Sequence, residues 1–368
     1  MQKKTRPKGH GCGANRSGVA AALAAALVAA APALADPIED FYRGKQLTIV
    51  IRGTPGGNYD SYSRLLARYL PKYIPGNPVA VPVNMPAGGG LAAFNQVMNI
   101  APKDGTVMTI ITETFPMDQA LGLNKNLAVD LRSINCIGNM SDSNQMLVTR
   151  QDSETRTLED AKRRVTVVGA SGISSTSTEL MALYNNMLGT QFKIVYGYPS
   201  GAELTFAMDR GEIEGRSTGT IGSLRPPANA KPGLAPFNFL IQTGMRKLPN
   251  FPTVPLLREL AKNPDEQAIY DFFSAAIAVS RPVCMAPHVP PERVTAMRRA
   301  FDATMQDKNL VSEAERMGLD ITPMKGEELQ QLIKDMVETS PERLEAVRQA
   351  IQVRSAVRAP GAKEEKPE

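Results

Sequence analysis

Four turns rich in glycine and hydroxyl-bearing residues each follow an apolar, strand-like run and precede a helix-like stretch. They occupy residues 54–60, 86–90, 169–175 and 197–201. Glycine lets backbone N–H groups face outward at such a turn, and the following helix adds the positive end of its dipole. A helix N-terminus of this kind can bind an anion without a charged side chain. One such turn more often serves only to reverse and cap the chain, but four together favour anion binding.

The side chains that carry most enzymatic chemistry are scarce. After residue 35 the chain has one histidine, His288, and two cysteines, Cys136 and Cys284. A clustered His/Cys metal centre cannot be assembled from these residues, whereas an all-carboxylate site stays open. None of the four turns has the glycine spacing of a dinucleotide fingerprint or the lysine of a P-loop. We therefore expect a binding protein without a cofactor. An enzyme that uses Asp60 and Glu113 as acid and base is a rival interpretation.

The N-terminal segment has the pattern of an export signal. A basic start is followed by an apolar, alanine-rich run at residues 19–31, and Ala33-Leu34-Ala35 supplies a small-x-small cleavage sequence. The apolar run is short for a membrane span, and no later segment approaches that length. We expect a signal peptide at residues 1–35, cleavage after Ala35 and a periplasmic mature protein.

Removal of residues 1–35 would change the charge of the chain. That segment contains five of the 42 basic residues and none of the 37 acidic residues, which leaves 37 of each. The excess positive charge therefore belongs to the targeting segment. A mature chain of net charge near zero, without a basic stripe, argues against a nucleic-acid partner.

Strand-like runs alternate with helix-like stretches along the rest of the chain. Tryptophan is absent and aromatic residues make up 5% of the sequence. This pattern is typical of an α/β protein with parallel strands, in which ligands bind at the carboxyl ends of the strands. Two of the turns come early in the chain and two come later, as a cleft between two lobes would require.

Two motifs lie at the early turns. The first reads Pro55-Gly56-Gly57-x-x-Asp60-x-x-x-Arg64-Leu65, and the second reads Asn84-Met85-Pro86-Ala87-Gly88-Gly89-Gly90. Further characteristic segments occupy residues 102–106, 169–178, 195–201, 208–215, 248–255 and 286–290. In this order they resemble the solute receptors of tripartite tricarboxylate transporters, the Bug-type periplasmic binding proteins. The resemblance covers essentially the whole mature chain.

This resemblance implies a two-lobed periplasmic binding protein of type II-like fold. Two α/β domains would be joined by a two-strand hinge, with a ligand cleft between them. Lobe one would combine residues 36–136 with residues 284–358, and lobe two would comprise residues 137–283. Residues 359–368 are polar and are expected to form a disordered tail.

The resemblance also implies a function. The protein would capture a small carboxylate-bearing metabolite by lobe closure and deliver it to the subunits of a separate membrane permease. It would be a monomer that does not itself span the membrane. The same fold could instead act as a ligand-sensing co-receptor for a membrane signalling protein.

Carried over position by position, the resemblance implies ligand contacts at all four turns. In lobe one these are Gly57, Asn58, Asp60, Ala87, Gly88 and Gly89. In lobe two they are Ser171, Gly172, Ser174, Ser175, Tyr198, Ser200 and Gly201. Asp60 could serve mainly as a helix cap, and Tyr198 could pack against the lobe surface.

Two arginines could add charge to the site. Arg52-Gly53-Thr54 stands where the family commonly has an aromatic residue or a proline. If Arg52 faces the cleft it offers a carboxylate a bidentate partner, and a salt bridge to Glu113 is the alternative. Arg216, at the end of a lobe-two strand, is the preferred charged contact for the ligand, with a hinge-side ion pair as its alternative.

The two remaining cysteines have a structural interpretation. If Cys136 and Cys284 lie on the two hinge strands, they could be cross-strand neighbours. An oxidising periplasm would then permit a disulfide that closes a long loop.

Overall fold

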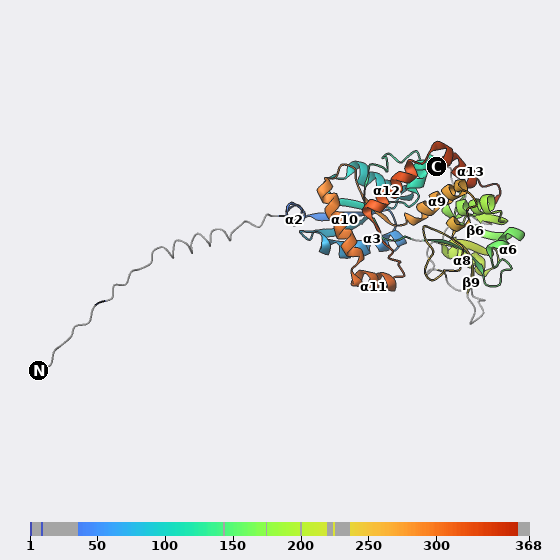
Figure 1. The fold of residues 1–368 in the computed structure, drawn as a ribbon, viewed down its shortest axis with the longest axis horizontal. Helices are drawn as coiled ribbons and strands as arrows, with labels where there is room; N and C mark the ends of the chain where they lie inside the picture. Colours follow the sequence, from blue (N-terminus) through green and yellow to red (C-terminus); the bar gives the residue numbers. More distant parts are fainter. Residues whose placement is uncertain are drawn as a thin grey trace.

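The computed structural model describes residues 36–142, 144–173, 175–198, 201–218 and 236–359, together with Met1, Gly9 and Leu224. Two six-stranded sheets, each packed against helices, form the two halves of this part of the chain (Figure 1). The expected cleavage sequence and the tail after Ala359 lie outside the described residues. In the part of the chain that is described, no helix is both long and apolar enough to cross a bilayer.

The first sheet has the strand order β11-β4-β10-β3-β1-β2. Its strands are β1 (Gln46–Ile51), β2 (Val79–Asn84), β3 (Val107–Ile110), β4 (Asn135–Asn139), β10 (Pro282–Met285) and β11 (Met324–Lys325). β1 is parallel to β2 and β3, whereas β10 is antiparallel to β3 and β4. Along β1, Leu47 and Ile49 enter one apolar core and Val50 enters another, because successive side chains of a strand point to opposite faces.

Helices cover both faces of this sheet. They are α2 (Pro37–Tyr42), α3 (Asn58–Tyr69), α4 (Leu91–Asn95), α10 (Pro291–Met305), α11 (Lys308–Arg316) and α12 (Gly326–Val337). α3 and α10 bury apolar side chains in the core that contains Leu47, and α4 and α12 bury theirs in the core that contains Val50. Short 3₁₀ or π segments follow or precede several helices: η1 (Leu70–Tyr73), η2 (Gly88–Gly90), η3 (Gln96–Ile100), η4 (Tyr184–Leu188) and η6 (Leu257–Leu260).

The second sheet has the order β12-β7-β6-β8-β5-β9. Its strands are β5 (Gln145–Arg150), β6 (Thr166–Ala170), β7 (Phe192–Tyr196), β8 (Gly215–Thr218), β9 (Phe237–Thr243) and β12 (Ala356–Arg358). β6 is parallel to β7 and β8, and β5 is antiparallel to β8 and β9. The parallel strands bring the turns after β6 and β7 to the same edge of the sheet.

Most helices around the second sheet pack into one large core. They are α5 (Phe115–Leu121), α6 (Leu158–Arg163), α7 (Thr176–Leu183), α9 (Pro264–Ala278) and α13 (Pro341–Ala350). α8 (Gly201–Asp209) packs into a second core with Met146 and Val148 of β5. The chain passes between the sheets after β4, returns after α9, and passes to the second sheet again between α12 and α13. The first two of these passages, called the crossings, correspond to the expected two-strand hinge.

The C-terminal segment returns to the second sheet. The sequence assigned residues 284–358 to lobe one, but β12 pairs in parallel with β7, with Ala356 opposite Ile194. The helix α13 ends at Ala350, before this strand. Leu344 and Val347 of α13 are buried in the second core, so its apolar residues attach this segment to the second half of the molecule.

Candidate functional site

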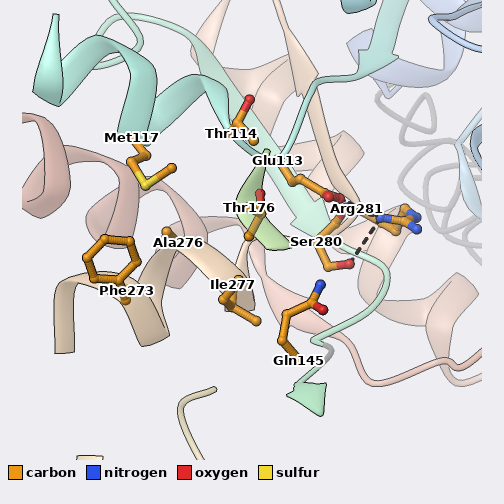
Figure 2. A pocket seen from close by; sticks show the side chains of 10 residues that line it. All are labelled: Glu113, Thr114, Met117, Gln145, Thr176, Phe273, Ala276, Ile277, Ser280 and Arg281. Carbon is orange, nitrogen blue, oxygen red and sulfur yellow. Dashed lines mark hydrogen bonds and ion pairs between the residues drawn. The ribbon is translucent and has the colours of Figure 1, made fainter. Parts of the chain in front are cut away.

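A cavity of about 210 Å³ lies between the two sheets, beside the crossings (Figure 2). Its walls come from the segment after β3, from α5, from the first residues of β5 and α7, and from α9 with the two residues that precede β10. The lining residues are Glu113, Thr114, Met117, Gln145, Thr176, Phe273, Ala276, Ile277, Ser280 and Arg281. Both halves of the molecule therefore contribute side chains to one cavity.

Arg281 organises the polar end of this cavity. Its Nη1 donates to Oε2 of Glu113 at 2.9 Å and forms an ion pair with it. Its Nε and Nη2 donate to Oδ1 of Asn58 at 3.1 and 2.7 Å. Glu113 Oε2 also accepts from the Tyr59 hydroxyl at 3.1 Å. Glu113, which the sequence suggested as a partner for Arg52, is thus a partner of Arg281.

Tyr59 lies between two guanidinium groups. The Arg52 Cζ is 4.2 Å from the centre of the Tyr59 ring, and the Arg281 Cζ is 4.6 Å from it. Burial, and then the nearby Glu113 carboxylate, raise the pKa of Tyr59 to about 12, so the ring stays neutral and can stack with both cations. Arg52 also lies against Gly90, where a Cβ would be 2.6 Å from Nε and φ is +107°. Glycine at position 90 therefore makes room for Arg52 beneath the second turn.

Asp60 holds the first turn rather than capping its helix. α3 begins at Asn58 with Gly57 as its N-cap, so Asp60 lies within the first turn of the helix. Its carboxylate accepts from the Gly56 N–H, from Asn84 and from Arg64. Burial raises the pKa of Asp60, but these hydrogen bonds outweigh it and lower that pKa to about 2. The carboxylate is thus ionised and committed to the turn. In the second turn, Ala87 is the N-cap of η2, which contains Gly88 and Gly89.

In the third turn, Ser175 is the N-cap of α7, its hydroxyl oxygen accepting from the Thr178 N–H. The same hydroxyl donates to the Gly172 carbonyl at 2.8 Å. Ser171 is exposed in the same turn. Tyr198 is buried in the core around α8, which is the packing alternative considered for it. Ser174 and Ser200 lie outside the described residues.

Arg216 is a charged residue buried in the second half of the molecule. It is only 4% exposed, and its Nε is buried without a hydrogen-bond partner among the described residues. No ion pair joins it to a described carboxylate, and burial lowers the pKa of the guanidinium. A Cβ on Gly201 would lie 3.1 Å from its Nη1, which places the guanidinium at the N-terminus of α8. Two positive electrostatic features therefore meet without a described anion between them.

Cys136 and Cys284 face each other across β4 and β10, in register. Both thiols are free and buried, with their Sγ atoms 3.3 Å apart. Burial, followed by the neighbouring Cys136, raises the pKa of Cys284. The disulfide remains a prediction for this pair.

None of the described predicted contacts lines the cavity. Among them, Asn58 touches the lining through Arg281, and Ser175 caps the helix that begins at the lining residue Thr176. The apolar wall from α9 and the role of Arg281 were not predicted. No local motif marks them, and only a pair of polar residues, Ser280 and Arg281, interrupts the apolar sequence between α9 and β10.

One sequence pattern has a catalytic spacing. Residues 215–219 read Gly-Arg-Ser-Thr-Gly, which matches G-x-S-x-G. A nucleophile elbow places its serine on a sharp turn between a strand and a helix. Ser217 instead lies within β8, where its hydroxyl donates to Oε1 of Gln145 at 3.0 Å. His288, the one histidine among the described residues, is exposed in the segment after β10.

A family model and several solved structures are similar to this chain. A family model described as "Tripartite tricarboxylate transporter family receptor" matches residues 63–348. No curated protein matches the sequence. A TctC solute binding protein from Polaromonas is 19% identical, with a TM-score of 0.64 over 84% of this chain and 99% of that chain.

Two further similar structures come from Rhodopseudomonas palustris. One, with bound malate, is 16% identical, with a TM-score of 0.56 over 82% of this chain and 98% of its own. The other, with adipate, is 18% identical, with a TM-score of 0.55 over 83% and 97%. At such identities the likeness establishes the fold. The predicted α/β fold of a two-lobed periplasmic binding protein is confirmed.

Proposed function

Because the chain belongs to the family of tripartite tricarboxylate transporter receptors, we propose that it is a periplasmic solute-binding protein for a small carboxylate-bearing metabolite. The solute binds between the lobes, the lobes close around it, and the closed form is delivered to the subunits of a tripartite tricarboxylate-type membrane permease. Binding and release require no covalent step.

The observation that carries this proposal is the buried guanidinium of Arg216 at the N-terminus of α8. A buried charge is costly unless it is paired. A carboxylate placed there would accept a charge-assisted hydrogen bond from Arg216 and would lie at the positive end of the helix dipole. The electrostatic environment of Arg216 therefore favours the binding of an anion.

The first lobe offers complementary groups. Arg52 and Arg281 stack on Tyr59, and Arg281 also contacts Asn58 in the turn that begins α3. These residues adjoin the shared cavity, so a solute held at Arg216 would meet them when the lobes close. The malate and adipate in the two Rhodopseudomonas palustris structures are both dicarboxylates, which supports an acidic solute here.

We assign lobe one to residues 36–136 and 284–337, and lobe two to residues 137–283 with 341–358. The pairing of β12 with β7 and the burial of α13 in the second core support this division. Closure would then bend the two crossings and the link between α12 and α13, and would move α13 with the second lobe.

A thermal-shift panel tests the function. The purified protein is unfolded and refolded to remove any carried solute, then melted with mono-, di- and tricarboxylates. An acid at about a hundred times its Kd adds about 2.7 kcal/mol of stability, which raises the Tm visibly. A rise confined to one class of acid supports the proposal, and the absence of a shift with every acid contradicts it.

A further inference from the structure

We propose that the cavity beside the crossings is a subsite for the apolar body of the solute, so that the protein prefers acids with an aliphatic or aryl chain over compact, hydroxylated ones. This inference rests on the proposed function, because the acid group of the same solute is assigned to Arg216.

One side of the cavity is built from apolar side chains. Phe273, Ala276 and Ile277 come from α9, and Met117 reaches it from α5 (Figure 2). All four are buried, with exposed fractions between 1% and 8%. Spacings of three and four residues place Phe273, Ala276 and Ile277 on one face of the helix. Their side chains offer no hydrogen-bonding atoms, so a hydroxyl group buried against them would lack a partner and bind less well.

The opposite side of the cavity is polar. Thr114, Thr176, Gln145 and Ser280 line it. The Gln145 side chain accepts from Ser217, the residue after Arg216 on β8. Successive side chains of a strand point to opposite faces, so Arg216 and the cavity lie on either side of the end of β8. A solute that reaches both must therefore extend across the edge of the sheet.

This geometry predicts that affinity depends on the chain length of the acid. Compact acids can reach Arg216 but not the wall formed by α9, whereas longer acids bury methylene groups there. Each methylene that enters an apolar site tightens binding about fourfold. The gain should stop when the cavity is full.

The test is a calorimetric titration of the refolded protein with linear monocarboxylates of two to ten carbons. The expected result is a stretch of the series in which Kd falls about fourfold per methylene, followed by a plateau. The variant Ala276→Leu fills part of the cavity, so the fall in Kd should stop at a shorter chain length. The Kd of the shortest acids should not change.

A matched control is Ala275→Leu, one position away on α9. Ala275 is also buried but lines a separate groove with Leu332 and Ala346, so this variant should keep the wild-type series.

Two outcomes would contradict the proposal. If carboxylates from the thermal panel bind but Kd is constant or rises with chain length, the apolar subsite is wrong, whereas the proposed binding of acids is unaffected. If no carboxylate binds at all, both the subsite and the proposed function are wrong. The wild-type series decides the question even if neither variant folds.

Discussion

The side-chain oxygen of Asn139 accepts a 2.7 Å hydrogen bond from the backbone N–H of Arg281. The same buried amide donates to the carbonyl oxygens of Ser141 and Ala278, both at 2.8 Å. One side chain thus joins the two crossings between the sheets. Since Arg281 also binds Glu113 at the cavity, the geometry of the crossings and that of the site depend on the same residue.

The variant Asn139→Ala should destabilise the protein by at least about 2 kcal/mol, because it removes three hydrogen bonds and leaves buried backbone groups without their partner. Urea-induced unfolding measures the change. Asn99→Ala is the control, since Asn99 is exposed and, among the described residues, its side chain bonds only to that of Asn95. The control should change stability by less than about 0.5 kcal/mol. Equal effects of the two variants would show that Asn139 does not hold the crossings.

Glu179 on α7 makes stability depend on pH. It is 8% exposed and its Oε2 has no described hydrogen-bond partner. Burial, and then the charge of Asp118 on α5, raise the pKa of Glu179 to about 7. The folded protein therefore binds a proton that the unfolded chain has lost, and stability falls as the pH rises from about 4.5 through 7.

The variant Glu179→Gln should abolish this fall and stabilise the protein at pH 8 by up to about 3 kcal/mol relative to wild type. The measurement is the Tm of both proteins at intervals from pH 5 to pH 8. Parallel curves for the two proteins would mean that Glu179 is ionised in the folded state.

Oxidised protein should contain a bond between Cys136 and Cys284. Their buried sulfur atoms are 3.3 Å apart on paired strands, and a bond there would close a long loop and stabilise the fold by about 2–5 kcal/mol. Alkylation of protein without residues 1–35, denatured but not reduced, should label no thiol, and reduction should lower the Tm. Two labelled thiols would rule the bond out.

The strand–turn–helix units were predictable because their signals are local. Apolar runs, glycines and helix stripes lie within a few residues, and the expected elements appear as β1 with α3 and as β6 with α7. Arg216 could be singled out because it is a charged residue in a predicted strand, although it is the second residue of β8 rather than the last. The family motifs predicted the two-lobed fold.

Other features depend on contacts between distant residues. Arg281 bonds to Asn58 across 223 positions, and nothing near Arg281 in the sequence marks it. The pairing of the short strand β12 with β7 depends on the burial of α13 rather than on local preference. In the sequence, the residues of α9 that form the apolar wall cannot be distinguished from an ordinary buried helix face. Only the position of α5 opposite α9 shows that they line a cavity.

The most direct test of the account is a titration of wild-type protein and of Arg216→Gln with the acid that gives the largest thermal shift. Loss of the buried guanidinium should weaken binding about a hundredfold. Arg164→Gln is the control, because Arg164 is already paired with Glu214 in the same half of the molecule, and it should bind as the wild type does. Equal affinity of wild type and Arg216→Gln would contradict the assignment of the solute carboxylate to Arg216.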